Sequence, residues 1–448
     1  MTLSPRAWLR EFAPWLLEED LGVCVVGSTA LRTACERAGV EGPTTADLDM
    51  SWALDVGSGI ELLQRHDVWM KTTDASQRRG TLAMKLDDTR VEITTFRVPS
   101  SSSAARGESE RSMADQIADD LAGRDMTLGA VAHWLTEDRI VDPFGGLDAW
   151  REKRIAPVGD PAARIEEHPI RWIRYYRRSH QWGFELDAAI RAVDLDPRII
   201  EREPAEAIGG ELRAALLECA SPGEFLRDLY DNSLLEVISP ELASQFDGRA
   251  AGPLKHHPEG SQANHMILAL EWIADRAKDL PERDRLTATV AVLCHDLGKS
   301  LTPKELLPSH HGHELSGIEP LRALLDRYPG LTDPAGKRLA EAVCTLHLTI
   351  RQLDELRPGT RARLYERNFR DKNFRADLFA LAVGADSGGR LDKAREGDEV
   401  ARTVRDGIEW MQSRCATIDV GALYETHKND KERFKSELHQ AWTRVLKR

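Results

Sequence analysis

Residues Val23–Ser28, with the sequence VCVVGS, begin the pattern that decides the fold of this chain. Four apolar, strand-favouring residues end at a Gly-Ser pair, and residues 29–38 then carry apolar side chains at helical spacing. Residues 47–54 and 90–96 have the alternation and the β-branched or aromatic content of strands. The first hundred residues therefore predict an α/β domain.

The rest of the chain has the pattern of a helical protein. From about residue 110 onward we find helical periodicity and no second group of strands, so the remainder is predicted to be all-α. Proline and glycine near residues 158–161 and 247–253 mark candidate domain boundaries.

Composition and charge exclude several classes of protein. The 448 residues are 41% apolar and 30% charged, as in ordinary soluble proteins, and no apolar run approaches the roughly 18 residues of a membrane helix. The N-terminus lacks a basic region followed by an apolar core, and the six cysteines are scattered singly, so we expect a cytoplasmic protein with no membrane partner. The net charge of −13 argues against a general nucleic-acid coat but is compatible with a local basic groove.

Three features in order suggest phosphoryl-transfer chemistry. Gly27 and Ser28 open a helix, where backbone N–H groups favour phosphate. Asp47 and Asp49 are two residues apart on a strand, so both would face one side and could hold two Mg²⁺ ions about 4 Å apart. Glu92, on a later strand, could complete the cluster. Each feature alone is equally compatible with a turn, a solvated loop or an exposed strand residue, and only their order carries the interpretation.

Longer blocks resemble a known family. Residues 119–132 (DDLAGRDMTLGAVA), 142–148 (DPFGGLD) and 167–177 (EHPIRWIRYYR) resemble blocks of the class II tRNA nucleotidyltransferases, the CCA-adding enzymes, and of the related bacterial poly(A) polymerases. The resemblance covers roughly residues 20–185, and it places the domain in the superfamily that includes DNA polymerase β.

The resemblance implies roles for individual residues in this first domain. Asp47 and Asp49 would bind metal, with Glu92 as the third catalytic carboxylate. The expected nucleotide-binding residues are Gly27 and Ser28 at the triphosphate turn, Arg32, Arg124, Asp125, and the base-reading positions His168, Arg171 and Arg174.

The base-reading block departs from the family pattern. His168 occupies the position of an aspartate that would accept from the amino group of C or A, and Gly129 replaces the usual asparagine. An imidazole accepts only in one tautomer and lacks the charge, so we expect weakened base selection unless Glu167 supplies the carboxylate. The arginines of this block, spaced by three residues, could instead simply face water.

A second group of residues has the spacing of a metal site. His265 precedes His295-Asp296 by one helix, and the motif His-Asp-x-Gly-Lys follows an apolar helix. Eight of the fourteen histidines lie between His256 and His347, whereas an isolated His-Asp would be an ordinary polar pair.

Residues 293–317 resemble the HD phosphohydrolase domain of the enterobacterial-type CCA-adding enzymes. By that resemblance His265, His295, Asp296 and Asp386 bind a divalent metal such as Ni²⁺, Co²⁺, Mn²⁺ or Mg²⁺. Lys299 and His310, His311 or His313 would contact phosphate. The implied activities are phosphatase and 2′,3′-cyclic phosphodiesterase or 2′-nucleotidase action.

Two basic segments are candidates for RNA contact. Residues 361–375 interleave basic and aromatic side chains, which suits backbone binding with stacking. We favour the alternative, an amphipathic helix pair whose aromatic residues pack inward. Residues 428–448 are interpreted as a packing helix.

Together these patterns predict an α+β protein: an N-terminal polymerase-β-like nucleotidyltransferase α/β head followed by mostly α-helical neck, body and HD domains. The expected divisions are 1–155 (head), 156–255 (neck and body, RNA and base recognition), 256–400 (HD domain) and 401–448 (C-terminal helices). The expected function is template-independent addition or repair of the 3′-terminal CCA of tRNA, or of another RNA 3′ end, from CTP and ATP with Mg²⁺. The alternatives are an HD phosphohydrolase with a diverged head and a poly(A) polymerase relative. The oligomeric state stays open.

Overall fold

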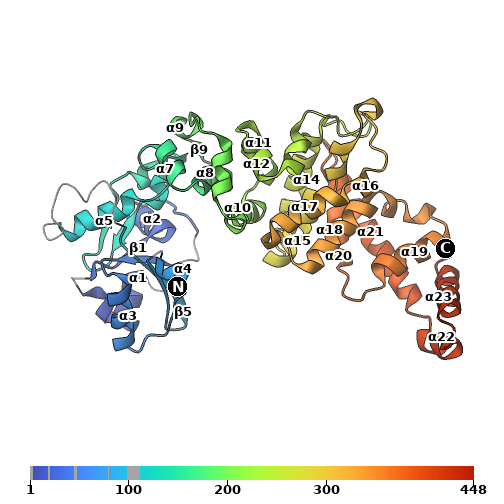
Figure 1. The fold of residues 1–448 in the computed structure, drawn as a ribbon, viewed down its shortest axis with the longest axis horizontal. Helices are drawn as coiled ribbons and strands as arrows, with labels where there is room; N and C mark the ends of the chain where they lie inside the picture. The colour runs from blue at the N-terminus through green and yellow to red at the C-terminus, as the bar shows by residue number, and fades with distance from the viewer. Residues whose placement is uncertain (1–3, 19–20, 45–47, 79, 98–110, 448) are drawn as a thin grey trace. The chain divides into compact units, whose positions relative to one another are not determined.

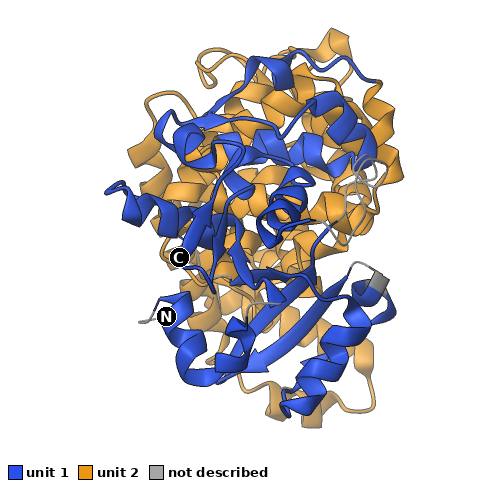
Figure 2. Cartoon of the chain, turned by 90° about the vertical axis from the view of Figure 1, so that its left-hand side faces the viewer, with its two compact units in different colours: residues 1–179, 183–195 blue, residues 180–182, 196–448 orange. Residues whose placement is uncertain are grey.

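The computed structural model describes residues 4–18, 21–44, 48–78, 80–97 and 111–447, and the structural statements below refer to these. The chain forms two compact units (Figure 2). Unit 1 comprises residues 1–179 and 183–195, and unit 2 comprises residues 180–182 and 196–448. Each unit is described by itself.

Unit 1 is built on a seven-stranded sheet with the strand order β3-β4-β5-β2-β1-β6-β7 (Figure 1). β2 and β5 pair in parallel, and the other neighbouring strands pair antiparallel. The strands are β1 (Cys24–Val26), β2 (Asp49–Trp52), β3 (Met70–Lys71), β4 (Thr81–Leu86), β5 (Thr89–Thr95), β6 (Ala132–Trp134) and β7 (Arg139–Val141). A separate parallel pair joins β8 (Arg154–Ile155) to β9 (Glu185–Leu186).

Helices accompany this sheet in unit 1. They are α1 (Pro5–Phe12), α2 (Gly27–Arg37), α3 (Val56–Arg65), α4 (Asp74–Arg78), α5 (Met113–Ala122), α6 (Gly146–Arg151), α7 (Pro161–Glu167), α8 (Ile170–Trp182, whose last three residues belong to unit 2) and α9 (Ala188–Arg191). Ser112 is the N-cap residue of α5 and forms a capping box with Asp115. The Ser112 hydroxyl accepts from the Asp115 N–H, and the Asp115 carboxylate accepts from the Ser112 N–H.

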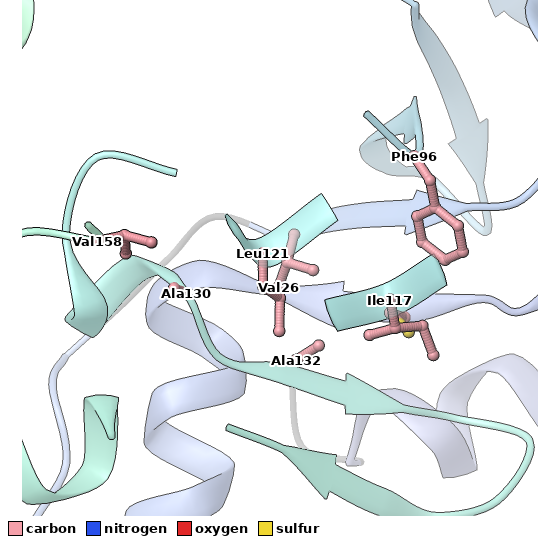
Figure 3. Packing of buried hydrophobic residues seen from close by; sticks show 8 residues of the cluster. Val26, Phe96, Ile117, Leu121, Ala130, Ala132 and Val158 are labelled. Carbon is pink, nitrogen blue, oxygen red and sulfur yellow. The ribbon is translucent and has the colours of Figure 1, made fainter. Parts of the chain in front are cut away.

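A small apolar cluster fastens α5 to the sheet (Figure 3). Ile117 and Leu121 of α5 pack with Val26 of β1 and Ala132 of β6, and each of these four residues is buried. The cluster therefore fixes the end of α5, from which the chain continues into residues 123–125, against the strand that leads into α2.

Unit 2 is helical (Figure 1). Its helices are α10 (Ala205–Glu218), α11 (Pro222–Asp231), α12 (Leu234–Ile238), α13 (Pro240–Ala243), α14 (Gln262–Ala277), α15 (Glu282–Cys294), α16 (His313–Ser316), α17 (Ile318–Arg327), α18 (Pro334–Ile350), α19 (Pro358–Leu364), α20 (Ala376–Gly388), α21 (Ala394–Cys415), α22 (Val420–His427) and α23 (Lys431–Val445). α14, α15, α18 and α20 pack against one another and form the support of the histidine cluster described below. None of the helices in the described part of the chain is long and apolar enough to cross a bilayer.

The expected α/β head followed by a mainly helical remainder is confirmed, but one part of the prediction is wrong. β6 and β7 lie beyond residue 110 and extend the sheet beside β1, and β8 and β9 form a separate pair there, although we expected no further strands in that region. Each of these strands is two or three residues long, which is too short for a strand pattern to stand out from its surroundings. The four-part domain division stays a prediction.

The aromatic residues of segment 361–375 pack inward, as the favoured interpretation expected. Phe369 is fully buried and contacts Phe374 and Phe379, and Tyr365 lies edge-on to Trp442 of α23. They are therefore part of the packing between α19, α20 and α23.

Candidate functional sites: a carboxylate pocket and a histidine cluster

The sheet of unit 1 brings two of the predicted carboxylates together. Asp49 begins β2 and stands directly opposite Glu92 of β5 in the parallel register. Both side chains line a pocket, together with Ser51, Thr94 and the arginines introduced below. Neighbouring residues of paired strands project to the same face, so Asp49 and Glu92 can offer oxygens to one cation. Asp47, the partner expected for Asp49, lies outside the described residues.

The predicted triphosphate turn, Gly27 and Ser28, lies at the beginning of α2. Gly27 has φ of +67°, a conformation that favours glycine, and it joins the end of β1 directly to the helix. A methyl group at Gly27 would lie 4.0 Å from Nη1 of Arg124, which also lines the carboxylate pocket. The N-terminus of the helix and a guanidinium group therefore face the same region, which suits a polyphosphate. Arg32 lies further along α2, where its Nε is 3.7 Å from Glu36 Oε1.

Residues 123–125 are held in place by α8. Arg174 donates to Asp125 Oδ2 at 2.8 Å, and the Tyr175 hydroxyl donates to the Asp125 backbone oxygen at 2.8 Å. Burial would raise the pKa of Asp125, but the neighbouring Arg174 outweighs burial and lowers it, so the carboxylate is ionised. Asp125 is thus a fixed acceptor beside Arg124.

Arg171 is buried and bonded to protein groups. Its Nη1 donates to the Arg164 oxygen at 3.1 Å and to Glu167 at 2.8 Å, and its Nη2 donates to the Gly123 oxygen at 2.9 Å. Here the guanidinium acts as a positioning group that ties the α7–α8 junction to the Gly123 loop. His168, at the C-terminal end of α7, is exposed. Glu167 is shared between two arginines, since Arg164 also donates to it at 2.9 Å.

Two residues of this pocket, Arg97 and Asp120, were not identified as site residues from the sequence. Arg97 lines the pocket, and its backbone N–H donates to Asp120 Oδ1 at 3.1 Å. Asp120 is buried and lies 3.6 Å from Arg124 Nη2. Asp120 lies in the block 119–132 that resembles the family, but no role was expected for its carboxylate, and Arg97 stands in no recognisable pattern, because the pocket is assembled from several strands and α5.

In unit 2 the structure brings four histidines and two aspartates together. Two groups, each with ligand atoms within 4.8 Å of one another, are His265, His295 and Asp386, and Asp296, His313 and His347. The predicted ligands His265, His295, Asp296 and Asp386 all belong to this cluster.

Asp296 links the two groups, because its oxygens face different histidines. Oδ2 lies 3.1 Å from His295 Nε2, and Oδ1 lies 3.2 Å from His313 Nε2 and 3.7 Å from His347 Nε2. His313, which the sequence analysis placed at the phosphate, lies among the candidate ligands, 3.3 Å from His347 Nε2. His347 was not identified as a ligand from the sequence, where it is one of several polar residues of α18 and belongs to no motif.

The tautomer of each of the four histidines is set by an acceptor at Nδ1. His295 Nδ1 lies 2.6 Å from the Val292 oxygen, His313 Nδ1 lies 2.6 Å from the His310 oxygen, and His347 Nδ1 lies 3.1 Å from the Val343 oxygen. His265 Nδ1 lies 2.9 Å from a Glu259 carboxylate oxygen. A carbonyl oxygen can only accept, so Nδ1 carries the proton and Nε2 keeps its lone pair.

The Nε2 atoms that result are positioned as ligands. Those of His265 and His295 are buried and make no hydrogen bond, which is costly unless a cation binds there. Burial lowers the pKa of His347 to about 4, so this imidazole is neutral. Burial would lower the pKa of His295 and His313, but Asp296 outweighs burial, chiefly by its charge at His295 and by its hydrogen bond at His313, and raises both pKa values. Imidazole nitrogen with carboxylate oxygen suits Zn²⁺, Ni²⁺, Co²⁺ or Mn²⁺.

The cluster opens onto a cleft lined by the expected phosphate contacts. Lys299 is buried and its Nζ lies 2.6 Å from Asp296 Oδ2. Both nitrogens of His310 already have protein partners, Thr302 Oγ1 at 2.9 Å and the Ala250 oxygen at 2.8 Å. His311 is exposed in the cleft wall, and Arg390 also lines the cleft, with its Nη2 3.6 Å from Asp386 Oδ1.

The glycine of the His-Asp-x-Gly-Lys motif has a packing role. A methyl group at Gly298 would lie 2.0 Å from the His313 oxygen and 2.6 Å from the Gly317 nitrogen. The backbone of α16 therefore approaches Gly298 too closely for any side chain. This contact sets how near His313 stands to Asp296.

Comparisons with known proteins agree with this architecture. Residues 38–156 match the family described as "Poly A polymerase head domain", and residues 263–369 match the family described as "HD domain". Together with the two sites, these matches define a class of protein in which a polymerase head is joined to an HD metal domain.

Similar proteins identify the family within that class. The multifunctional CCA protein of Mannheimia succiniciproducens is 30% identical over 332 residues, covering 73% of this chain and 76% of that protein. The multifunctional CCA protein of Neisseria gonorrhoeae (strain NCCP11945) is 32% identical over 285 residues, and the match spans 61% of this chain and 64% of that protein. This chain belongs to the multifunctional CCA protein family, as its sequence blocks indicated.

A solved structure shares the fold. The CCA-adding enzyme of Bacillus stearothermophilus, in complex with CTP, has a TM-score of 0.63 at 17% identity, covering 99% of this chain and 92% of that one.

Proposed function

We propose that this protein adds or repairs the 3′-terminal CCA of tRNA from CTP and ATP in the cytoplasm, and that unit 2 carries a metal-dependent phosphohydrolase site. The observation that supports the first activity most directly is the register that sets Asp49 opposite Glu92, in a pocket shared with Arg124. The relatives named as multifunctional CCA proteins point to the same activity.

In the head, the chain's own residues bind and orient the reactants. Asp49 and Glu92, with Asp47, would hold Mg²⁺, which when bound neutralises triphosphate charge and activates the attacking hydroxyl. Arg124 binds the phosphates where the N-terminus of α2 already favours negative charge. Arg174 keeps Asp125 fixed and ionised as an acceptor for the sugar.

Base selection falls to residues of the α7–α8 junction. The Arg174 side chain is about one-third exposed, and His168 is exposed. Arg171, bound to Gly123 and Glu167, fixes the junction that carries them. Glu167 is paired with two arginines, and the proposal assigns base reading to His168, at the position where the family has an aspartate.

In unit 2, the cluster can hold two divalent ions. His265, His295 and Asp386 would bind one, His313 and His347 would bind the other, and Asp296 would contact both. A bound ion supplies an activated water for hydrolysis of a phosphate ester. Lys299 and Arg390, with His311, provide positive or hydrogen-bonding groups at the cleft for the phosphate.

The test of the first activity is nucleotide addition to defined RNA ends. The full chain is incubated with Mg²⁺, each labelled NTP, and tRNA ending before CCA, after C or after CC. We expect C, C and A to be added at the respective ends, and Asp49→Asn to abolish addition. His295→Gln serves as the matched control, since it alters only unit 2 and should leave addition within a small factor of wild type. Absence of addition on every RNA would refute the proposal and favour the HD-only alternative.

The test of the second activity is hydrolysis of a 2′,3′-cyclic nucleotide with Ni²⁺, Co²⁺, Mn²⁺ or Mg²⁺. We expect His295→Gln to abolish it and Asp49→Asn to leave it unchanged. Failure of wild type with all four ions would refute a hydrolytic role for unit 2.

A further inference from the structure

A buried carboxylate lies directly behind one of the candidate metal ligands. We propose that Glu259 is a positioning residue of the HD site, which fixes the proton of His265 on Nδ1 and strengthens Nε2 as a metal ligand. This inference rests on the proposed metal site of unit 2 and names a residue outside the ligand set. Glu259 stands in the short loop before α14, and its side chain is 1% exposed.

The surroundings of Glu259 consist of imidazoles. Its Oε1 lies 2.9 Å from His265 Nδ1 and 2.8 Å from His257 Nδ1. In the described part of the chain, these two histidines are its only ion-pair partners, and no lysine or arginine contacts its carboxylate. A buried charge is costly unless it is paired and hydrogen-bonded, so the two imidazole N–H groups are what makes its ionised form tolerable.

The loop itself is built to hold this carboxylate in place. The Glu259 backbone oxygen accepts from Asn264 Nδ2 at 2.9 Å and from the Ser261 N–H at 3.1 Å. Ser261 also caps α14, because its hydroxyl accepts from the Asn264 N–H. The loop is therefore anchored to the same helix that carries His265, which sets the reach of the carboxylate to the ring.

His265 differs in this respect from the three other histidines of the cluster. Those three have backbone carbonyls within hydrogen-bonding distance of Nδ1, and the Glu314 carboxylate stands 3.6 Å from His313 Nδ1, whereas a Glu259 carboxylate oxygen lies 2.9 Å from His265 Nδ1. A carboxylate acceptor fixes the tautomer as a carbonyl does, and in addition makes the imidazole a stronger donor to a metal. The Glu259 carboxylate therefore strengthens metal binding at the ion position that His265 forms with His295 and Asp386.

His257 contacts the same carboxylate oxygen of Glu259 and lies in the wall of the cleft. Its ring stands nearly perpendicular to that of His265, with ring centres 5.1 Å apart, and it lines the cleft. A methyl group at Gly252 would come within 2.4 Å of the His257 ring, so a glycine is required there. Glu259 therefore holds one ring at the metal position and another in the cleft wall.

The experiment measures Co²⁺ binding to the full chain. The HD-site component is the part of the titration that His295→Gln removes. We expect Glu259→Gln, which keeps the size and an acceptor oxygen but loses the charge, to weaken this component roughly 10–100-fold. Glu241→Gln is the matched control: Glu241 is a largely buried carboxylate of the same unit that binds Arg327, and its loss should leave Co²⁺ affinity unchanged.

A second readout needs no metal. In the metal-free protein, ¹⁵N NMR of labelled histidine should show His265 as a single Nδ1–H tautomer in wild type and as a mixture in Glu259→Leu. Either wild-type affinity in Glu259→Gln or an unchanged His265 signal in Glu259→Leu would overturn the inference.

The outcomes separate this inference from the proposed function. If His295→Gln removes no Co²⁺ binding, the metal site itself is refuted. If it does remove binding and Glu259→Gln binds as wild type does, only the positioning role is wrong. Should Glu259→Gln unfold, Glu259→Asp keeps the charge but shortens the reach by one methylene. A folded Glu259→Asp protein with undiminished affinity would then refute the role.

Discussion

Replacing His313 by glutamine distinguishes two chemical roles for this residue. The sequence analysis assigns it to the phosphate, whereas the structure places its Nε2 3.2 Å from Asp296 Oδ1 and 3.3 Å from His347 Nε2. The ring is 5% exposed and its Nδ1 is oriented by the His310 oxygen. His313 lines the cleft, but these distances direct its Nε2 toward Asp296 and His347, which favours a metal ligand over a phosphate contact.

The expected magnitude follows from the composition of the site. The second ion position has three side chains, and His313→Gln removes one of its two nitrogens. Changes behind a ligand already cost 10–100-fold in affinity, so losing the ligand itself should cost at least about 100-fold, or about 2.7 kcal/mol. Folding should lose only about 1 kcal/mol, the value of one hydrogen bond to the His310 oxygen.

The assay is the metal content of the full chain after equilibration with Co²⁺, combined with the KM for a cyclic nucleotide. We expect two HD-site ions in wild type and one in His313→Gln. His311→Gln is the matched control, because His311 is an exposed residue of the same cleft and should retain both ions. Two ions in His313→Gln with a raised KM would refute the ligand role and restore the phosphate role. One ion in wild type would refute the two-ion arrangement.

The other predictions concern packing, pH and base selection. Gly298→Ala should lower the melting temperature and the metal content of the HD site, because the added methyl group would overlap the His313 oxygen. Gly359→Ala is the control: Gly359 lies in α19, an added methyl group there would meet nothing within 4 Å, and the substitution should stabilise the protein by up to about 1 kcal/mol. Equal melting temperatures of the two variants would contradict this prediction. Burial would raise the pKa of Glu241, but two hydrogen bonds from Arg327 outweigh burial and lower it. Its stabilisation is therefore present above the unfolded pKa of about 4.3 and is lost as the pH falls below that value, so the stability difference between wild type and Glu241→Gln should shrink between about pH 6 and pH 3. A difference independent of pH would show that the pair contributes only packing. His168→Asp should sharpen selection of CTP and ATP over UTP and GTP, measured as relative incorporation on one RNA, because a missing complementary group costs on the order of 10²–10⁵ in discrimination. Strict selection in wild type that His168→Asp abolishes would show that the imidazole itself reads the base.

Local sequence determined the parts of this protein that depend on neighbours along the chain. The strand β1 and the helix α2 that begins at Gly27 were predictable, because an apolar run, a glycine and a helical pattern follow one another in the sequence. The pairing of Asp49 with Glu92 was anticipated as a cluster on neighbouring strands, and β5 lies within one residue of the expected limits. The resemblance to the HD domain implied that His265, His295, Asp296 and Asp386 form one group, and the fold brings them together.

The tertiary structure alone decided what depends on packing between distant elements. His347 and Glu259 carry no local signal, since each is one of several polar residues in its segment and belongs to no motif. They matter because α18 packs against α15 and α20, and because the loop before α14 brings Glu259 to His265. Arg171 looks in the sequence like a helix-surface arginine, yet the fold buries it on the Gly123 oxygen. Spacing along a chain shows which residues share one element, but where the Nε2 of His313 points is determined by the close approach of α16 to Gly298, a contact made only in the folded chain.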